Sequence, residues 1–220
     1  MRIVIAGGHG QIALRLERLL AARGDSAAGL IRNPGQADDL RAAGAEPVVL
    51  DLESAVVEEV AAVLAGADAA VFAAGAGAGS GAERKQTVDR GAAVLFADAA
   101  ERAGVRRYLV VSSMGADADA SGGDPVFAAY LRAKGAADDD IRSRTGLDWT
   151  VLRPGALTND AGSGLVRLSP TTGRGAVPRD DVAAVLAELL HTPATAGLTL
   201  ELVSGNDPVP AAVRAAAGTS

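Results

Sequence analysis

Short apolar runs alternate along the chain with longer segments in which apolar residues recur every three or four positions. The first such pair is Arg2–Ala6, an apolar run, followed by Gln11–Arg23. Within Gln11–Arg23 the apolar side chains with helical spacing are Ile12, Leu16, Leu19 and Leu20. This spacing predicts a helix with one apolar face, and Gly24 supplies the residue that commonly ends a helix.

The same alternation continues to the end of the chain. Further strands are predicted at Ala27–Ile31, Pro47–Leu50, Ala69–Ala73, Arg107–Val111, Trp149–Leu152 and Leu198–Val203. Further helices are predicted at Gln36–Ala43, Glu53–Ala65, Arg84–Ala103, Tyr130–Thr145 and Asp180–Leu190, with a loose or frayed helix at Ala211–Ser220. Because strands separated by helices of this length pair in parallel through right-handed crossovers, we expect a doubly wound α/β Rossmann fold.

Two segments depart from this alternation. Ala156–Val177 is rich in Gly, Thr, Ser and Pro and is expected to form a small substrate-side insertion at the edge of the sheet. Gly75–Ala82 (GAGAGSGA) fits either a flexible segment over a ligand or a mobile connector. Since no change of composition marks a boundary, residues 1–220 are predicted to form a single domain.

Composition narrows the functional classes. The net charge of −6 disfavours nucleic-acid binding, which needs a basic surface. No apolar run approaches the roughly 18 residues of a membrane span, and no secretory leader is evident. With no cysteine and two histidines, no metal site is expected. We therefore expect a cytoplasmic protein, monomeric or homodimeric, that acts on a small molecule still to be identified.

A glycine-rich turn follows the first predicted strand. Gly7, Gly10 and Ala13 give the spacing G-x-x-G-x-x-A at a strand–helix junction. In this context the first position permits a tight turn, the second lets the backbone approach a pyrophosphate, and the third lets helix and sheet pack closely. The turn predicts a dinucleotide site, in which Gln11 and Ile12 at the start of the helix also contact the cofactor.

The residue after the second predicted strand bears on which dinucleotide binds. A site for NAD(H) usually has Asp or Glu here, to accept a hydrogen bond from the ribose 2′-hydroxyl, whereas this chain has Arg32. A guanidinium suits the 2′-phosphate of NADP(H), so NADP(H) is favoured over NAD(H). After the third strand, Asp51 is a candidate partner of the adenine amino group, with Leu52 beside it.

Candidate catalytic residues follow the fifth predicted strand. Ser112 and Ser113 come directly after it, and Tyr130 and Lys134 lie four positions apart on a predicted helix. A lysine ammonium near a phenol favours the phenolate, so the pair is suited to donate or accept a proton while hydride moves to or from nicotinamide. Lys134 is also expected to contact the ribose hydroxyls, and a serine hydroxyl to hold the substrate oxygen.

These motifs together resemble the short-chain dehydrogenase/reductase superfamily, in its atypical branch of small NAD(P)H-binding, epimerase- or NmrA-like proteins. The resemblance covers nearly the whole chain and rests on Gly7–Ala13, Arg32-Asn33-Pro34, Ala73-Ala74-Gly75, Val88-Asp89, Ser112-Ser113, Tyr130 with Lys134, Arg153-Pro154-Gly155 and Asp181-Val182-Ala183.

The resemblance implies further site residues. It places Ala73, Ala74 and Gly75 on the adenosine side of the cofactor. It places Pro154, Gly155 and Leu157 at the nicotinamide end. It also favours Ser113 as the catalytic serine, with Ser112 as the alternative. Asp89 stands where the wider superfamily has an asparagine that completes the catalytic tetrad, and a carboxylate cannot donate a hydrogen bond as an amide does.

Three functions are compatible with these residues. The first is an NADP(H)-dependent oxidoreductase that acts on a small carbonyl, quinone or flavin-like substrate, with Tyr130 as acid. The second is a cofactor-binding sensor without chemistry, for which Asp89 is the main support. An epimerase or dehydratase acting on a nucleotide sugar is the third, and it is disfavoured by the short insertion. The run Asp138–Asp140 is interpreted as a solvated helical face.

Overall fold

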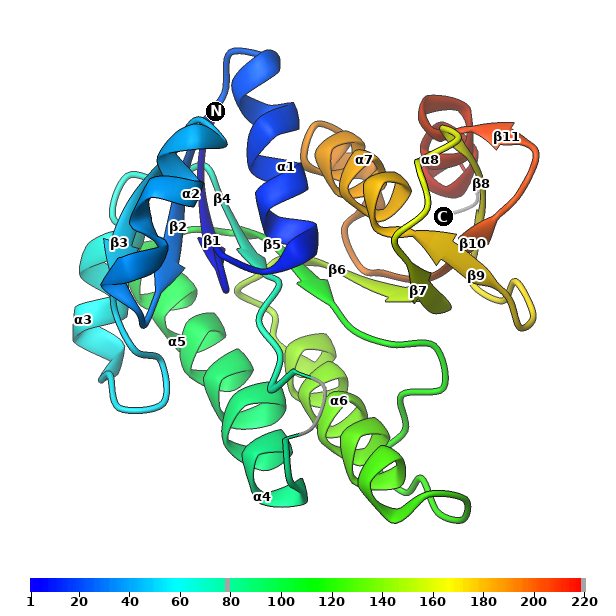
Figure 1. The fold of residues 1–220 in the computed structure, drawn as a ribbon, viewed down its shortest axis with the longest axis horizontal. Coiled ribbons are helices and arrows are strands. Elements are labelled where there is room, and N and C mark those ends of the chain that lie inside the picture. The colour runs from blue at the N-terminus through cyan, green and yellow to red at the C-terminus, as the bar shows by residue number, and fades with distance from the viewer. Residues whose placement is uncertain (78–79, 219–220) are drawn as a thin grey trace.

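The computed structural model describes residues 1–77 and 80–218, which form an α/β fold around a mostly parallel sheet (Figure 1). Among these residues, nine strands join in the order β11-β8-β10-β6-β5-β4-β1-β2-β3. The strands of this sheet are β1 (Arg2–Ala6), β2 (Ser26–Ile31), β3 (Ala45–Val49), β4 (Ala69–Phe72), β5 (Arg107–Val111), β6 (Asp148–Pro154), β8 (Leu165–Ser169), β10 (Leu198–Ser204) and β11 (Asp207–Pro208). The seven strands from β10 to β3 pair in parallel, so the predicted Rossmann fold is confirmed.

Helices cover both faces of the sheet. The α-helices are α1 (Gln11–Ala22), α2 (Ala37–Ala42), α3 (Val57–Leu64), α4 (Ala82–Arg84), α5 (Ala93–Ala103), α6 (Pro125–Ser143), α7 (Arg179–Leu190) and α8 (Val209–Ala217). Short 3-10 turns occur at η1 (Pro34–Gln36) and η3 (Pro193–Thr195). Helices α1 and α7 pack on one face, and α3, α5 and α6 on the other (Figure 1).

Several helix boundaries differ from the prediction for local reasons. Helix α6 begins at Pro125 rather than at Tyr130, because the Asp124 carboxylate accepts a hydrogen bond from the Phe127 amide at 2.7 Å and caps the helix. The predicted helix Arg84–Ala103 contains a π-helical segment, η2 (Lys85–Ala92), between α4 and α5. Such wide turns are uncommon and often lie at functional sites.

The segment 156–177 extends the edge of the sheet. Its first and last parts contribute β7 (Ala156–Thr158) and β9 (Ala176–Pro178), a separate two-stranded parallel sheet. Between them, β8 runs antiparallel to β10 in the main sheet. The glycine-rich loop 75–82 connects β4 to α4, and its residues 78–79 lie outside the described part of the chain, as do residues 219–220 at the predicted C-terminal helix.

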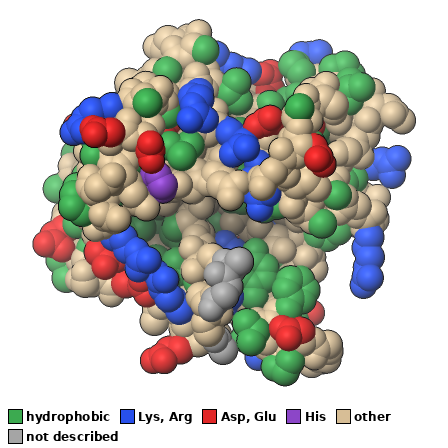
Figure 2. All heavy atoms as spheres, in the orientation of Figure 1, with side chains coloured by type: hydrophobic (Ala, Val, Ile, Leu, Met, Phe, Trp, Pro, Cys, Tyr) green, Lys and Arg blue, Asp and Glu red, His purple; other side chains and the backbone are tan. Residues whose placement is uncertain are grey.

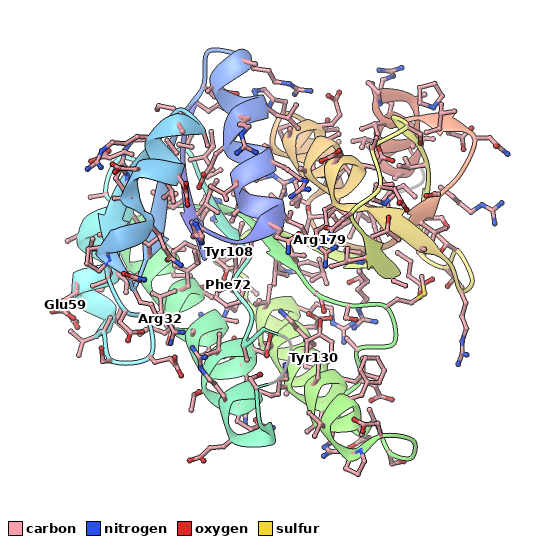
Figure 3. All side chains as sticks on the ribbon, in the orientation of Figure 1. Arg32, Glu59, Phe72, Tyr108, Tyr130 and Arg179 are labelled. Carbon is pink, nitrogen blue, oxygen red and sulfur yellow. The ribbon has the colours of Figure 1, made fainter. Side chains whose placement is uncertain are left out.

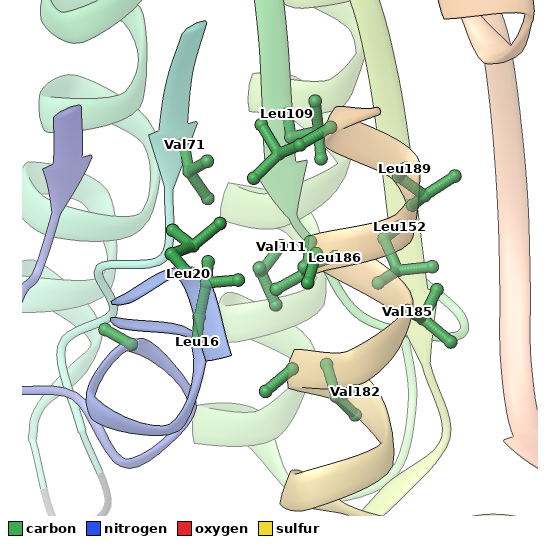
Figure 4. Close-up of a cluster of buried hydrophobic side chains, with 14 of the residues drawn as sticks. Leu16, Leu20, Val71, Leu109, Val111, Leu152, Val182, Val185, Leu186 and Leu189 are labelled. Carbon is green, nitrogen blue, oxygen red and sulfur yellow. The ribbon is translucent and has the colours of Figure 1, made fainter. Parts of the chain in front are cut away.

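The core lies in two layers, one on each face of the sheet. Figure 4 shows the layer between α7 and the strands, in which Leu186 and Leu189 lie near Leu109 and Leu152. The second layer, under α3, α5 and α6, includes Phe72, Phe96 and Tyr108, whose rings pack in sequence at centroid distances of 6.2 and 5.9 Å.

The buried face of α1 is rotated from the predicted one. Leu16 and Leu20 are fully buried, whereas Leu19, on the same predicted apolar face, is 36% exposed. Glu17 is fully buried instead, and neither of its carboxylate oxygens has a hydrogen-bond partner within the described residues. The helix turns Ala13 and Glu17 inward because Gly29 of β2 leaves room: a Cβ at that position would lie 2.7 Å from Glu17 Oε1.

A buried arginine ties together the amino ends of the central strands. Arg107, the first residue of β5, donates hydrogen bonds to the Asp148 carbonyl and the Thr150 hydroxyl of β6, at 2.9 and 2.8 Å. Its other terminal nitrogen donates to the Leu189 carbonyl of α7 and the Thr195 hydroxyl of η3, at 2.7 and 2.9 Å. This end of the sheet is therefore closed by polar contacts and lies opposite the carboxyl ends of the strands.

None of the helices in the described part of the chain combines the length and the apolar character needed to cross a bilayer. In the same residues, histidine and carboxylate side chains do not gather in groups of three or more that could hold a metal ion.

Candidate functional site

The glycine turn packs tightly between β1, β2 and β4. Gly7 has a φ of +80°, and a Cβ there would lie 2.7 Å from the Ala74 Cα. At Gly8 an added Cβ would lie 2.7 Å from the Gly29 Cα. These two positions therefore require glycine for conformation or close packing. At Gly10 the nearest atom to such a Cβ is the Gly7 carbonyl oxygen at 3.0 Å, which is also closer than an ordinary contact but less severe than at Gly7 and Gly8.

The first turn of α1 is suited to an anionic group. Gly10 precedes the helix in an extended conformation and offers no side-chain cap, and the first turn carries no acidic residue. An uncapped helix N-terminus presents backbone N–H groups and the positive end of the helix dipole. This geometry fits the pyrophosphate of a dinucleotide, as the sequence spacing predicts.

A cavity of about 270 Å³ lies at the carboxyl ends of β1, β2, β3 and β4. It is open, and its lining contains the glycine turn together with the ends of the neighbouring strands. The predicted cofactor residues in the lining are Gly7, Gly10, Arg32, Asp51, Leu52 and the run Ala73–Gly75. Because β1 and β4 adjoin in the sheet while their connections run to opposite sides, the cavity lies at the switch point where such folds bind ligands.

The remaining predicted cofactor residues lie outside this lining. Gln11 and Ile12 begin α1, and Ser112 and Lys134 lie beyond the strand end of β5 and on α6. At the predicted nicotinamide end, Pro154 ends β6, and the Gly155 amide donates to the Leu202 carbonyl at 2.9 Å. Leu157 is exposed on β7.

The Arg32 end of the cavity holds a cluster of charges that sequence reasoning did not predict. Glu53 lines the cavity with Arg32 and Arg84. Its Oε2 lies 3.1 Å from Arg84 Nη2 and 3.5 Å from Arg32 Nη1, and its Oε1 accepts a hydrogen bond from the Thr87 hydroxyl at 2.8 Å. The Thr87 hydrogen bond and the nearby Arg84 guanidinium hold the pKa of Glu53 below its ordinary value. We call Arg32, Glu53, Arg84 and Thr87 the Glu53 cluster.

Figure 2 shows this face of the molecule as a surface. A hollow runs across its middle, and basic and acidic side chains lie next to one another along the left-hand rim. Figure 3 labels Arg32 on that side and Tyr130 on α6. Arg32 lines the cavity, whereas Tyr130 lies on α6, outside the residues that line it.

Lys134 is buried and ion-paired, and it is not among the residues that line the cavity. Its ammonium lies 3.3 Å from Asp89 Oδ1 and donates to the Val111 carbonyl at 3.1 Å. Asp89 is fully buried, and its second oxygen accepts from the Ala76 amide at 3.4 Å. The structure thus brings together two of the predicted catalytic residues, Asp89 and Lys134, in a buried ion pair.

Tyr130 is partly buried and has a different lysine beside it. The Lys85 ammonium lies 5.3 Å from the centre of the Tyr130 ring and donates to the Gly77 carbonyl at 2.9 Å. Within the described residues, no hydrogen bond joins Tyr130 to Lys134. Sequence reasoning missed Lys85, because its closeness to Tyr130 arises from the packing of η2 against α6.

The two serines after β5 have different environments. The Ser112 hydroxyl is buried and donates to Asp138 Oδ2 at 2.8 Å, while Arg153 donates to the same oxygen at 2.9 Å. Burial raises the pKa of Asp138, and the Arg153 guanidinium opposes that shift. Asp138 is fully buried, so its interpretation as part of a solvated face is wrong. Ser113 is only partly buried, and its hydroxyl contacts the Met114 carbonyl at 3.2 Å.

Comparison with known proteins identifies relatives along almost the entire chain. Residues 7–193 match a family described as NAD(P)H-binding. A Bacillus subtilis protein named "Uncharacterized sugar epimerase YhfK" is 34% identical over 97% of this chain and 99% of its own length. Among solved structures, an NAD-dependent epimerase/dehydratase-like protein from Bacillus halodurans is 35% identical with a TM-score of 0.90, covering 98% and 99% of the two chains. The oxidoreductase ylbE from Lactococcus lactis is 26% identical with a TM-score of 0.84, covering 98% and 96%.

Proposed function

The chain belongs to the NAD(P)H-binding family and is an atypical, NmrA-like member of the short-chain dehydrogenase/reductase group; on this premise we propose that it is an NADP(H)-dependent oxidoreductase acting on a small carbonyl, quinone or flavin-like substrate. The observation that carries the proposal is a cavity whose lining contains both the glycine turn and Arg32. The resemblance to an oxidoreductase from Lactococcus lactis supports the reaction class.

The preference for NADP(H) rests on Arg32. Its guanidinium lines the cavity at the carboxyl end of β2, where a dinucleotide places its adenosine ribose. Planar donors of this kind bind a phosphate through paired hydrogen bonds. Paired titrations with NADPH and NADH are expected to give tighter binding of NADPH by the wild type and a loss of that preference in Arg32→Ala. Equal affinity for the two cofactors in the wild type would contradict this assignment.

Tyr130 is the proposed proton donor to the substrate. A bound nicotinamide supplies the hydride donor or acceptor. Tyr130 is suited to the accompanying proton transfer because its ring is partly exposed on α6 and lies beside the Lys85 ammonium. Lys134 is assigned a positioning role through Asp89, and Ser113 is assigned to hold the substrate oxygen because its hydroxyl is more accessible than that of Ser112.

The test of this chemistry is a scan of NADPH oxidation against quinones, flavins and aldehydes. Turnover is expected with at least one class and is expected to fall about 100-fold or more in Tyr130→Phe, in keeping with the usual contribution of a general acid. The phenylalanine variant keeps the ring, so its affinity for NADPH serves as the control for folding. Absence of turnover with every class, or full activity of Tyr130→Phe, would contradict the assignment.

A cofactor-binding sensor without chemistry is the second candidate. The observation that favours it is the buried ion pair of Lys134 with Asp89. Related dehydrogenases use a lysine at this position to contact the cofactor, and here its ammonium is paired with a carboxylate instead. This candidate predicts tight NADP(H) binding without turnover, and a partner protein whose binding changes when the cofactor is oxidised. A pull-down that gives the same partners with NADPH, with NADP⁺ and without cofactor would count against it.

An epimerase or dehydratase is the third candidate. The names of the Bacillus relatives favour it. The segment available to hold a sugar nucleotide is short, because 156–177 forms only β7, β8, β9 and their connections. Incubation with nucleotide sugars and NAD(P)⁺, followed by chromatography of the sugars, tests it directly, and conversion of any of them would replace our first candidate.

A further inference from the structure

The Glu53 cluster places a carboxylate of the protein where two arginines converge inside the cavity. Arg32 follows β2, Glu53 lies in the turn after β3, and Arg84 ends α4. Three separate elements thus meet at one carboxylate, with both guanidinium groups within 3.5 Å of the same Glu53 oxygen. The cluster is open at the surface, since the side chains of Arg32 and Arg84 are 56% and 37% exposed while that of Glu53 is 27% exposed.

Glu53 is held in this position by its neighbours. The Thr87 hydroxyl donates to Oε1 at 2.8 Å, and the Glu53 amide donates to the Asp51 carboxylate at 3.0 Å. The Thr87 hydrogen bond and the Arg84 guanidinium lower the pKa of Glu53, so its carboxyl is ionised at neutral pH. The arginines that would bind a ligand phosphate therefore already have an anionic partner.

The two dinucleotides differ in how they would meet this carboxylate. The 2′-phosphate of NADPH is a near-dianion and is attracted to Arg32 and Arg84, but it is repelled by Glu53 and competes with it for the same N–H donors. The 2′-hydroxyl of NADH is neutral and can donate a hydrogen bond to a carboxylate. The Glu53 carboxylate thus weakens the binding of NADPH and strengthens that of NADH at the same position, the 2′ group of the ribose.

We infer that Glu53 determines cofactor specificity by lowering the advantage that Arg32 and Arg84 give to NADPH over NADH. This inference rests on the proposed dinucleotide function and adds a residue that neither the sequence motif nor the comparisons assign. Arg84 is the second phosphate-binding cation in the same arrangement, and Thr87 is a positioning residue that fixes the carboxylate.

The test is a set of fluorescence titrations with NADPH and NADH on the full chain. Glu53→Gln keeps an oxygen for Thr87 and Arg84 and removes only the charge. The ratio of the NADH to the NADPH dissociation constant is expected to rise about tenfold, the size expected for removing one like charge near a phosphate at a protein surface. Arg84→Ala is expected to lower the ratio several-fold by weakening NADPH alone.

Matched controls separate this effect from a general change of charge. Glu46→Gln alters the net charge equally, but Glu46 lies at the amino end of β3, away from the cavity, and is expected to leave the ratio unchanged. Titration with 2′,5′-ADP and with ADP isolates the adenosine half. Only the affinity for 2′,5′-ADP is expected to rise in Glu53→Gln.

The outcomes distinguish this inference from the proposed function. If wild type and variants bind both dinucleotides but Glu53→Gln leaves the ratio unchanged or lowers it, the role of Glu53 is overturned while the cofactor site stands. If the wild type binds neither dinucleotide, the proposed function fails, and the inference fails with it. A rise in both Glu53→Gln and Glu46→Gln would assign the effect to net charge and also overturn the inference.

Discussion

Glu17 makes the stability of this protein depend on pH in a direction opposite to that of most carboxylates. Its side chain is fully buried between α1 and β2, next to Gly29, with neither oxygen hydrogen-bonded within the described residues. Burial raises the pKa of Glu17 from 4.5 to about 8. The carboxyl group is therefore protonated in the folded protein at neutral pH and ionised in the unfolded chain.

The magnitude follows from linkage. A carboxyl whose pKa is raised by folding stabilises the folded state fully below the unfolded pKa, and this contribution is lost as pH rises toward the folded pKa. The window is thus pH 4.5 to about 8. At about 1.4 kcal/mol per pKa unit, the loss is about 3 kcal/mol by pH 7 and about 4 kcal/mol by pH 8, where half of the folded molecules are ionised at Glu17.

Glu17→Gln removes this titration and keeps the shape of the side chain. Urea unfolding of wild type and variant at pH 5, 6, 7 and 8 is expected to give nearly equal free energies of unfolding at pH 5. The variant is expected to gain progressively above that pH. The exposed Glu46 supplies the control, since Glu46→Gln is expected to show no such trend. Parallel curves for wild type and Glu17→Gln across the four pH values would refute the reasoning.

Three further substitutions test other parts of the structure. Gly10→Ala is expected to weaken NADPH binding at least about tenfold by placing a methyl group at the pyrophosphate, and to lower the thermal unfolding temperature slightly, because the new carbon would lie 3.0 Å from the Gly7 carbonyl oxygen, closer than an ordinary van der Waals contact. Arg153→Met is expected to destabilise the fold by about 3 kcal/mol, measured by urea unfolding at pH 7, because it leaves the buried Asp138 carboxyl without its guanidinium partner. Lys134→Met is expected to lose more stability than a double variant that also carries Asp89→Asn, measured in the same way, because the single change leaves a buried charge unpaired.

Much of the fold was predictable because local signals agreed with the tertiary structure. The apolar run Arg107–Val111 was predicted with the bounds of β5, and the spacing of small residues placed the glycine turn at the end of β1. The early start of α6 also had a local signal, since Asp124 followed by Pro125 is a typical helix beginning. The burial of Glu17 rather than Leu19 on α1 had no such local signal, because it depends on the space that Gly29 leaves on the neighbouring strand β2.

The candidate site was predictable only where a sequence motif carries it. The glycine turn, Arg32 and Asp51 lie at strand ends whose position follows from the alternation of elements, and they line the cavity. Glu53 and Arg84 come from a turn and from a helix 31 positions further along the chain, so their meeting could not be inferred from spacing. The same holds for Asp138 of α6, whose hydrogen-bond partner Arg153 lies 15 positions further along the chain on β6.

The position of Arg107 has a consequence for how such a protein can diversify. Its contacts join β5, β6, α7 and η3 at one end of the sheet, and the cavity opens at the other. Substitutions around the cavity are therefore expected to leave the hydrogen bonds of Arg107 intact. The loops that follow β1, β2, β3 and β4 can accordingly be varied without touching the Arg107 contacts, and laboratory evolution of this chain is best directed to those loops.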